Sequence, residues 1–152
     1  MKKIVIVSLL ILLTGSIHCQ NIHQEVNGGR DCDTLFWTST EYPVRLKNDI
    51  SELQKIVSNQ LTVYPEDIEK SVKLTYQFTI TCNGINIGSS LYSYEGGQVL
   101  GLSKRILKIL DDYCIWSPAI QSETPVNSFY HLTIDFKKGK IVVIPQNKNE
   151  KK

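Results

Sequence analysis

Few residues in this chain have the type and spacing that acid–base or nucleophilic chemistry requires. The adjacent carboxylates Glu66-Asp67 and Asp111-Asp112 would point in different directions on a helix, so neither forms an acid/base pair. His131 occupies an outward position of a predicted strand, where a solvated histidine is a simpler interpretation than a general base. The sequence has no G-x-S-x-G, no phosphate loop and no Cys-His pair at a known spacing. We therefore expect no enzymatic activity and no cofactor.

The first 19 residues have the layout of a secretory signal peptide. Two lysines precede an apolar run from Ile4 to Leu13, and small residues follow it. This run is about half of the roughly 20 residues that a membrane-spanning helix needs, so cleavage before Ile17 or Gln20 is favoured over an uncleaved anchor. Lipidation of Cys19 is a weaker alternative, because the residues just before it are not all small. The expected location is the periplasm or the outside of the cell.

Composition predicts one small globular domain. Of the 152 residues, 41% are hydrophobic and 21% are charged. Two of the 17 basic residues, Lys2 and Lys3, lie in the predicted signal peptide, which leaves 15 basic against 15 acidic residues. Nucleic acids and anionic lipids are bound by basic patches that neutralise phosphates, so a balanced charge argues against both as partners.

Export favours disulfide bonds, because compartments outside the cytoplasm are oxidising. Cys32, Cys82 and Cys114 remain after cleavage, so at least one of the three is left over. Cys82 closes a predicted strand and Cys114 closes a predicted helix, which makes Cys82–Cys114 the favoured pair. No metal site is expected, since there is no C-x-x-C and the histidines His23 and His131 are distant from the cysteines in sequence.

Hydrophobic spacing predicts a helix and a β-hairpin in the first half of the domain. After an irregular extension over 20–43, apolar residues three and four apart indicate one buried face of a helix over about 44–61. Pro65 then begins a short helix. Residues 71–80 alternate between apolar and polar as a half-buried strand, and Asn83-Gly84 predicts a type I′ turn into a second strand over 85–94.

A second helix and a third strand follow. Apolar residues between Leu102 and Tyr113 share one helical face, and residues 128–136 alternate as a strand. Lys138-Gly139 is a possible tight turn into 141–144, an extra C-terminal strand that can cover the edge of the third strand. Residues 146–152 are too polar to fold.

The predicted domain spans 44–145 and belongs to the α+β class. Its elements follow in the order helix, strand, strand, helix, strand, which suits a two-layer sandwich. We expect a three-stranded antiparallel sheet with two helices packed on its one apolar face.

The stretch "CIWSPAI" at 114–120 is interpreted as a structural corner. Trp116 can fill the end of the sheet where a helix passes into a strand, burying on the order of 200 Å². Pro118 prevents the helix from continuing, and the small Ala119 follows it. A binding role for this tryptophan is the less favoured alternative.

Together, these elements resemble the C-terminal domain of TonB-type energy transducers. The resemblance covers about 44–136 and is carried by Tyr64-Pro65, Asn83-Gly84, Trp116, Pro118-Ala119 and Pro125-Val126. It implies structural roles for Tyr64, Pro65, Asn83, Gly84, Trp116, Pro118 and Ala119. It also implies a periplasmic domain that binds outer-membrane transporters, whose extended segment adds a strand to the edge of the sheet.

The resemblance thus implies an exported interaction module whose partner is an envelope protein, such as an outer-membrane transporter. The outward residues of the third strand are the expected partner-binding residues: His131, Thr133 and Asp135. That strand is also a candidate for homodimer formation. Two alternatives are a structural envelope domain without transport coupling and a short membrane-anchored transducer. The latter would lack the long proline-rich spacer of the family, since Pro43 is the single proline before the predicted domain.

Overall fold

The structure is a computed structural model that describes residues 32–145. The predicted signal peptide over 1–19 and the predicted disordered tail over 146–152 lie outside the described residues. The elements follow in the order β1 (Phe36–Trp37), β2 (Arg45–Leu46), α1 (Ile50–Gln60), α2 (Pro65–Ile68), β3 (Ser71–Ile80), β4 (Asn86–Glu95), α3 (Leu100–Tyr113), β5 (Trp116–Ser117), β6 (Ala119–Gln121), β7 (Thr124–Lys137) and β8 (Lys140–Pro145).

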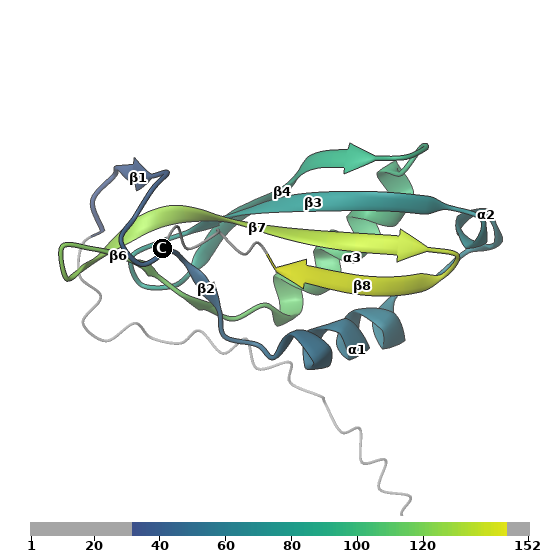
Figure 1. Cartoon of the computed structure of the whole chain (residues 1–152), viewed down its shortest axis with the longest axis horizontal. Helices are drawn as coiled ribbons and strands as arrows, with labels where there is room; N and C mark the ends of the chain where they lie inside the picture. Colours follow the sequence, from purple (N-terminus) through teal and green to yellow (C-terminus); the bar gives the residue numbers. More distant parts are fainter. Residues whose placement is uncertain (1–31, 146–152) are drawn as a thin grey trace, which may run out of the picture.

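Six of these strands form one mixed sheet that curls into a half-barrel (Figure 1). Its order is β1-β7-β3-β4, and β6 and β8 also pair with β7. β1 runs parallel to β7, and the other pairs of this sheet are antiparallel. β2 and β5 form a separate two-stranded sheet. The expected sandwich of a three-stranded antiparallel sheet and two helices is therefore wrong, because the described chain has a larger mixed sheet and three helices.

The strands that sequence reasoning missed are too short to show a period. β1, β2 and β5 have 2 residues each and β6 has 3, whereas alternation is recognisable only over about four residues or more. β7 begins at Thr124 because its first residues pair with β6 across the turn Ser122-Glu123. Both turn residues have positive φ, 48° and 62°, without the Asn or Gly that would mark such a turn in the sequence.

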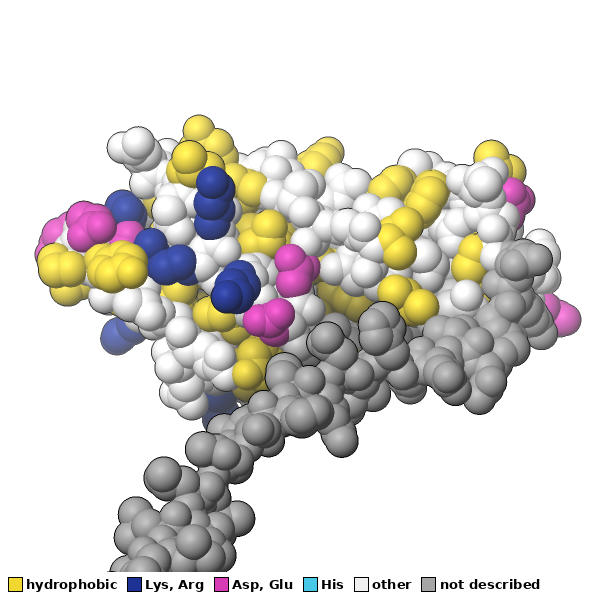
Figure 2. Space-filling view, turned by 180° about the vertical axis from the view of Figure 1, so that it is seen from behind, with side chains coloured by type: hydrophobic (Ala, Val, Ile, Leu, Met, Phe, Trp, Pro, Cys, Tyr) yellow, Lys and Arg dark blue, Asp and Glu magenta, His cyan; other side chains and the backbone are white. Residues whose placement is uncertain are grey.

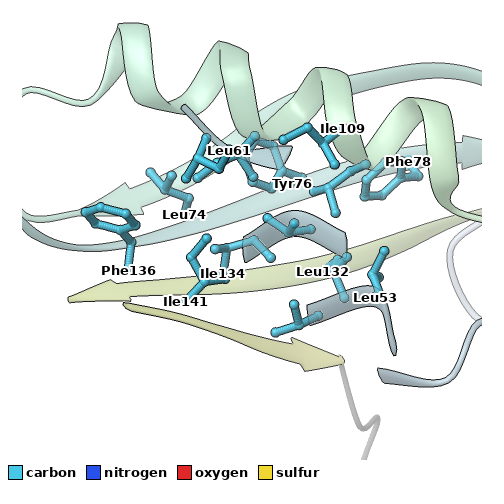
Figure 3. Close-up of a cluster of buried hydrophobic side chains, with 14 of the residues drawn as sticks. Leu53, Leu61, Leu74, Tyr76, Phe78, Ile109, Leu132, Ile134, Phe136 and Ile141 are labelled. Atoms are coloured by element: carbon cyan, nitrogen blue, oxygen red, sulfur yellow. The ribbon is translucent and has the colours of Figure 1, made fainter. Parts of the chain in front are cut away.

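The hydrophobic core lies between α1 and α3 and the face of the sheet that they cover, which we call the inner face (Figure 3). β3 is the central strand, paired with β4 on one side and β7 on the other. Its predicted bounds, 71–80, are confirmed. The alternation also gives its buried side chains correctly: Val72, Leu74, Tyr76, Phe78 and Ile80. The helices add Leu53, Val57, Leu102, Ile106 and Leu110 to the same core.

The first helix begins later than the sequence predicts. Asp49 caps α1 by accepting hydrogen bonds from the backbone N–H groups of Ser51 at 2.9 Å and Glu52 at 3.1 Å. The preceding residues are extended instead, because Arg45 and Leu46 pair with β5. Pairing with a strand distant in sequence overrides the helical spacing of apolar residues here. The short helix that begins at Pro65 is confirmed as α2.

The Asn83-Gly84 turn packs against the Trp116 corner. Gly84 has a φ of 77°, but Asn83 has no positive φ, so the predicted type I′ turn is wrong and a single left-handed residue closes this hairpin. A Cβ atom added to Gly84 would lie 3.0 Å from the backbone oxygen of Trp116 and 3.4 Å from Cδ of Pro118. The Trp116 ring is buried, with the rings of Phe78 and Tyr130 at 4.9 and 5.0 Å. Ala119 beside this corner is fully buried.

Candidate partner-binding surface

The three side chains predicted to bind a partner form one row on the outer face of β7, away from the helices: His131, Thr133 and Asp135. The Oγ1 atom of Thr133 lies 3.0 Å from Oγ1 of Thr75 on β3. Asp135 accepts a hydrogen bond from Nζ of Lys137 at 3.0 Å, and the His131 ring is 4.6 Å from the ring of Tyr92. All three side chains are half-buried. The sheet brings them together, and each is already engaged by side chains of the sheet itself.

β8 is the extra C-terminal strand that the sequence allows, and it covers part of the edge of β7. It pairs with β7 over Leu132–Lys137, so this chain itself occupies that stretch of edge. The outer edge of β8 is shielded in turn. The backbone N–H of Val143 donates to Oε1 of Gln54 on α1 at 3.2 Å, and Pro145 at the strand end has no N–H to offer. Little of this side of the sheet is left for a partner strand.

β4 forms the opposite edge of the sheet and, among the described residues, pairs only with β3. The N–H of Thr81, just after β3, donates to the backbone oxygen of Ile85 on the β4 side. Alternate residues of a strand point to opposite sides, so Gln77 bonds toward β4 and Phe78 toward β7. Gln77 pairs with Ser90 and Phe78 with Ser89, and this pairing runs without a break from Gly88 to Leu91. The N–H of Ser90 therefore bonds to β3, and the N–H of Ser89 faces the open edge.

Two bulges turn apolar side chains of β4 toward solvent. The register with β3 skips Ile87 and Tyr92, which marks one bulge at each residue. Simple alternation predicts Ile87 on the same face as the half-buried Leu91, and the bulge makes this prediction wrong. Ile87 is 60% exposed, Tyr92 63% and Tyr94 57%. We call Ile87, Tyr92 and Tyr94 the β4 edge patch. Sequence reasoning placed β4 within one residue of its bounds and missed the bulges.

A disulfide joins Cys32 to Cys82, with 5.7 Å between the Cα atoms. The expectation of a disulfide is confirmed, whereas the predicted Cys82–Cys114 pair is wrong. Cys82 lies just after β3, where the N-terminal segment passes on its way to β7. Cys114 caps α3 and carries a free, half-buried thiol. Burial, together with the charge of Asp111, raises the pKa of this thiol to about 12.

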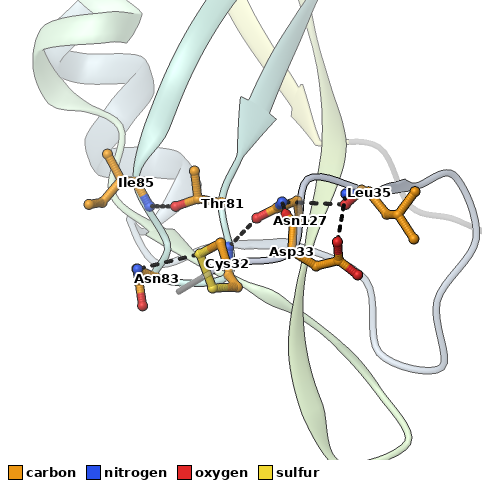
Figure 4. Close-up of a disulfide and its surroundings, with 8 residues drawn as sticks. Cys32, Asp33, Leu35, Thr81, Asn83, Ile85 and Asn127 are labelled. Atoms are coloured by element: carbon orange, nitrogen blue, oxygen red, sulfur yellow. Dashed lines mark hydrogen bonds between the residues drawn. A yellow bond between two sulfur atoms is a disulfide. The ribbon is translucent and has the colours of Figure 1, made fainter. Parts of the chain in front are cut away.

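Asn127 holds the N-terminal segment beside the disulfide (Figure 4). Its Oδ1 atom accepts a hydrogen bond from the backbone N–H of Cys82 at 2.8 Å. Its amide nitrogen donates to the backbone oxygens of Asp33 and of Leu35, the latter at 3.3 Å. The hydroxyl of Ser128 donates to the backbone oxygen of Trp37 at 2.6 Å. These bonds frame a crevice of about 350 Å³, which we call the disulfide crevice.

A buried ion cluster fixes α2 against α3. The carboxylate of Asp67 pairs with Arg105 and, at 2.7 Å, with Nζ of Lys70, and it accepts the backbone N–H of Tyr64 at 3.1 Å. Burial raises the pKa of Asp67, but the hydrogen bonds from Lys70 and Tyr64 and the charge of Arg105 outweigh it, so the pKa lies below its ordinary value. The Tyr64 ring lies 4.4 Å from the Arg105 guanidinium. Tyr64-Pro65 thus begins a helix that this cluster holds in place.

Within residues 32–145, no three His, Cys, Asp or Glu side chains lie together in a way that could hold a metal ion. The helices of this range are too short or too polar to span a membrane.

No protein-family model, curated protein or solved structure matches this chain. The resemblance to the TonB C-terminal domain stays a prediction.

Sequence reasoning missed the polar residues that organise this surface. Gln54 looks like an ordinary helix residue, and Asn127 lies in a segment with no visible period. Their roles depend on partners 89 and 45 residues away in the chain. Asp67 did carry a local signal, because an acidic residue in the first turn after Pro65 suits a helix N-terminus.

Proposed function

We propose that this chain is an exported protein-interaction module that binds an extended segment of an envelope protein by strand addition along β4. One observation carries the proposal: within residues 32–145, β4 is a 10-residue strand with an open edge, while the other side of the sheet is occupied by β8 and α1. Soluble proteins usually shield such edges, because unpaired backbone groups are a template for another strand. A long open edge is the feature that β-augmentation uses.

The β4 edge patch gives this edge apolar contacts as well as hydrogen bonds. Backbone groups such as the N–H of Ser89 would bond to the partner strand, and Tyr92 and Tyr94 would contact its side chains. Tyrosine suits such a contact because it offers a large apolar area together with a polar hydroxyl.

The Cys32–Cys82 disulfide supports the exported part of the proposal, since such bonds persist in oxidising compartments and are rare in the cytosol. The envelope partner, with an outer-membrane transporter as one example, comes from the TonB resemblance alone. The proposal differs from that family in one respect. The expected docking edge belongs to β7, but β8 covers it over Leu132–Lys137, so strand addition moves to β4.

The test uses peptides selected for binding to the oxidised full chain from a random peptide library displayed on phage. The selected peptides are synthesised, and their affinities for the Ser89→Ala and Ser89→Pro variants are compared by calorimetry. Both variants lose the hydroxyl that bonds to Asp111, and proline alone also removes the outward N–H, without touching a backbone bond to β3. Losing this bond should weaken binding by about tenfold, provided that urea unfolding shows the variant to be folded.

A matched pair of variants tests the same claim without proline. Tyr92→Ala with Tyr94→Ala removes exposed side chains at β4, and Val142→Ala with Ile144→Ala removes exposed side chains at β8. Weaker peptide binding by the first pair alone supports strand addition at β4. Failure to select any binding peptide, or equal losses from both pairs, would contradict the proposal and favour a structural envelope domain.

A further inference from the structure

The disulfide crevice is a second recess on the surface, apart from the β4 edge. One wall is the N-terminal segment with Asp33, Leu35 and Trp37, and the other is the β6–β7 hairpin with Pro125 and Val126. Cys32 and Cys82 lie between the two walls. Trp37 is 40% exposed and Leu35 61%, so an apolar surface remains accessible at the mouth. The crevice therefore combines apolar side chains with a carboxylate.

Among the described residues, the charges around this crevice have one sign. The two described segments that build it, 32–44 and 115–127, contain Asp33, Glu41 and Glu123 but no Lys or Arg. The described basic residue nearest to them along the chain is Arg45. On the face shown in Figure 2, the Lys and Arg side chains gather at the other end of the molecule, away from β1 and β6. The crevice thus lies at an acidic end of a molecule whose net charge is small.

Of these carboxylates, Asp33 is the one placed to meet a ligand. Glu41 is engaged, since its two oxygens accept hydrogen bonds from Nε2 of Gln121 at 3.3 Å and from the backbone N–H of Ser122 at 3.1 Å. Asp33 lines the crevice and makes a long contact of 3.4 Å with the backbone N–H of Leu35. A carboxylate has about four acceptor sites, so Asp33 keeps most of its capacity.

We infer that the disulfide crevice binds an arginine or lysine side chain of a partner polypeptide. The apolar stem of such a side chain would lie along Leu35, Val126 and the Trp37 ring, and its cation would meet the carboxylate of Asp33. Arginine fits best, because its planar guanidinium pairs with a carboxylate through two hydrogen bonds and stacks on an indole. The volume of about 350 Å³ suffices for one such side chain and its neighbours.

The inference is independent of strand addition at β4 and is tested with a defined set of peptides. The probes are Ac-GLRLRG-NH2, its glutamine analogue Ac-GLQLQG-NH2 and its glutamate analogue Ac-GLELEG-NH2. Binding to the oxidised full chain is followed by calorimetry and by tryptophan emission, to which the exposed Trp37 contributes beside the buried Trp116. We expect the arginine peptide to bind at least about tenfold more tightly than the other two, and less tightly as salt is added.

Variants locate the binding. Asp33→Asn should weaken binding of the arginine peptide by about tenfold. The control is Glu69→Gln, which removes an exposed carboxylate at α2, far from the crevice, and should leave this affinity unchanged. Ser89→Pro should also leave it unchanged, which separates this site from the β4 edge. Equal binding of the three peptides, no binding at all, or no effect of Asp33→Asn would overturn the inference. Binding of the arginine peptide only after deletion of 146–152 would overturn it too. The basic C-terminal residues of this chain, and not a partner, would then be the occupant of the crevice.

Discussion

Gln54 on α1 accepts a hydrogen bond from the backbone N–H of Val143 at 3.2 Å, and this bond adds a polar link to the packing of the first helix on the last strand. It satisfies a donor that an edge strand would otherwise present to another chain. The two edges of the sheet therefore differ: β8 is shielded by the protein itself, and β4 is left open by the described part of the chain. This difference is the basis of the proposed docking site.

The shield can be removed with one substitution. Gln54→Leu keeps the size of the side chain but cannot accept the bond, so the free energy of unfolding should fall by about 1 kcal/mol. Amide hydrogen exchange at Val143 should become faster at the same time. Lys55→Ala, on the exposed side of α1, is the control and should change neither quantity. Unchanged exchange at Val143 in the Gln54 variant would show that the helix does not shield this edge.

Two glycines separate backbone strain from close packing at the Trp116 corner. Gly84 and Gly139 have nearly the same φ, 77° and 76°, but a Cβ atom would approach the Trp116 oxygen to 3.0 Å only at Gly84. Gly139→Ala should therefore cost about 1 kcal/mol for φ alone, and Gly84→Ala about 1 to 2 kcal/mol more. Urea unfolding measures both. Equal costs would mean that the turn does not pack on the corner.

The disulfide closes a long loop, because Cys32 and Cys82 are 50 positions apart in the sequence. Loop-closure entropy of that length corresponds to about 4 kcal/mol, so Cys32→Ser with Cys82→Ser should lower the free energy of unfolding by about 2 to 4 kcal/mol. Cys114→Ser should have a small effect, since this thiol is unpaired. Peptide mapping without reduction identifies the pair directly. A fragment that joins Cys82 to Cys114 would contradict the structure.

The Asp67 cluster predicts a pH dependence with a definite sign. The folded pKa of Asp67 lies below its unfolded value of 3.8, so its contribution is complete above that value and is lost as the pH falls through the folded pKa. Asp67→Asn should cost about 2 kcal/mol near neutral pH, and the difference from wild type should shrink below about pH 4. Urea unfolding across this range tests it. A difference that stays constant down to low pH would show that the charge of Asp67 does not stabilise the fold.

Local rules predicted the parts of this fold whose causes are local. The alternation of Val72 to Ile80 gave β3 and its buried face, and Pro65 gave the start of α2. The missed parts depend on residues far apart in the chain. Leu46 is extended because it pairs with Trp116, and Cys82 bonds to Cys32 because an N-terminal segment returns to the sheet. Of the candidate sites, the outer-face row of β7 was predictable from local alternation, but no local pattern shows which edge stays open.

The most direct test of strand addition at β4 is residue-resolved hydrogen exchange by NMR, with and without a saturating selected peptide. Strand addition predicts that the amide of Ser89 becomes protected, because its N–H then bonds to the peptide, while protection at Val143 stays as it was. Protection that appears along β7 or β8, with the β4 amides unchanged, would contradict the proposed docking site.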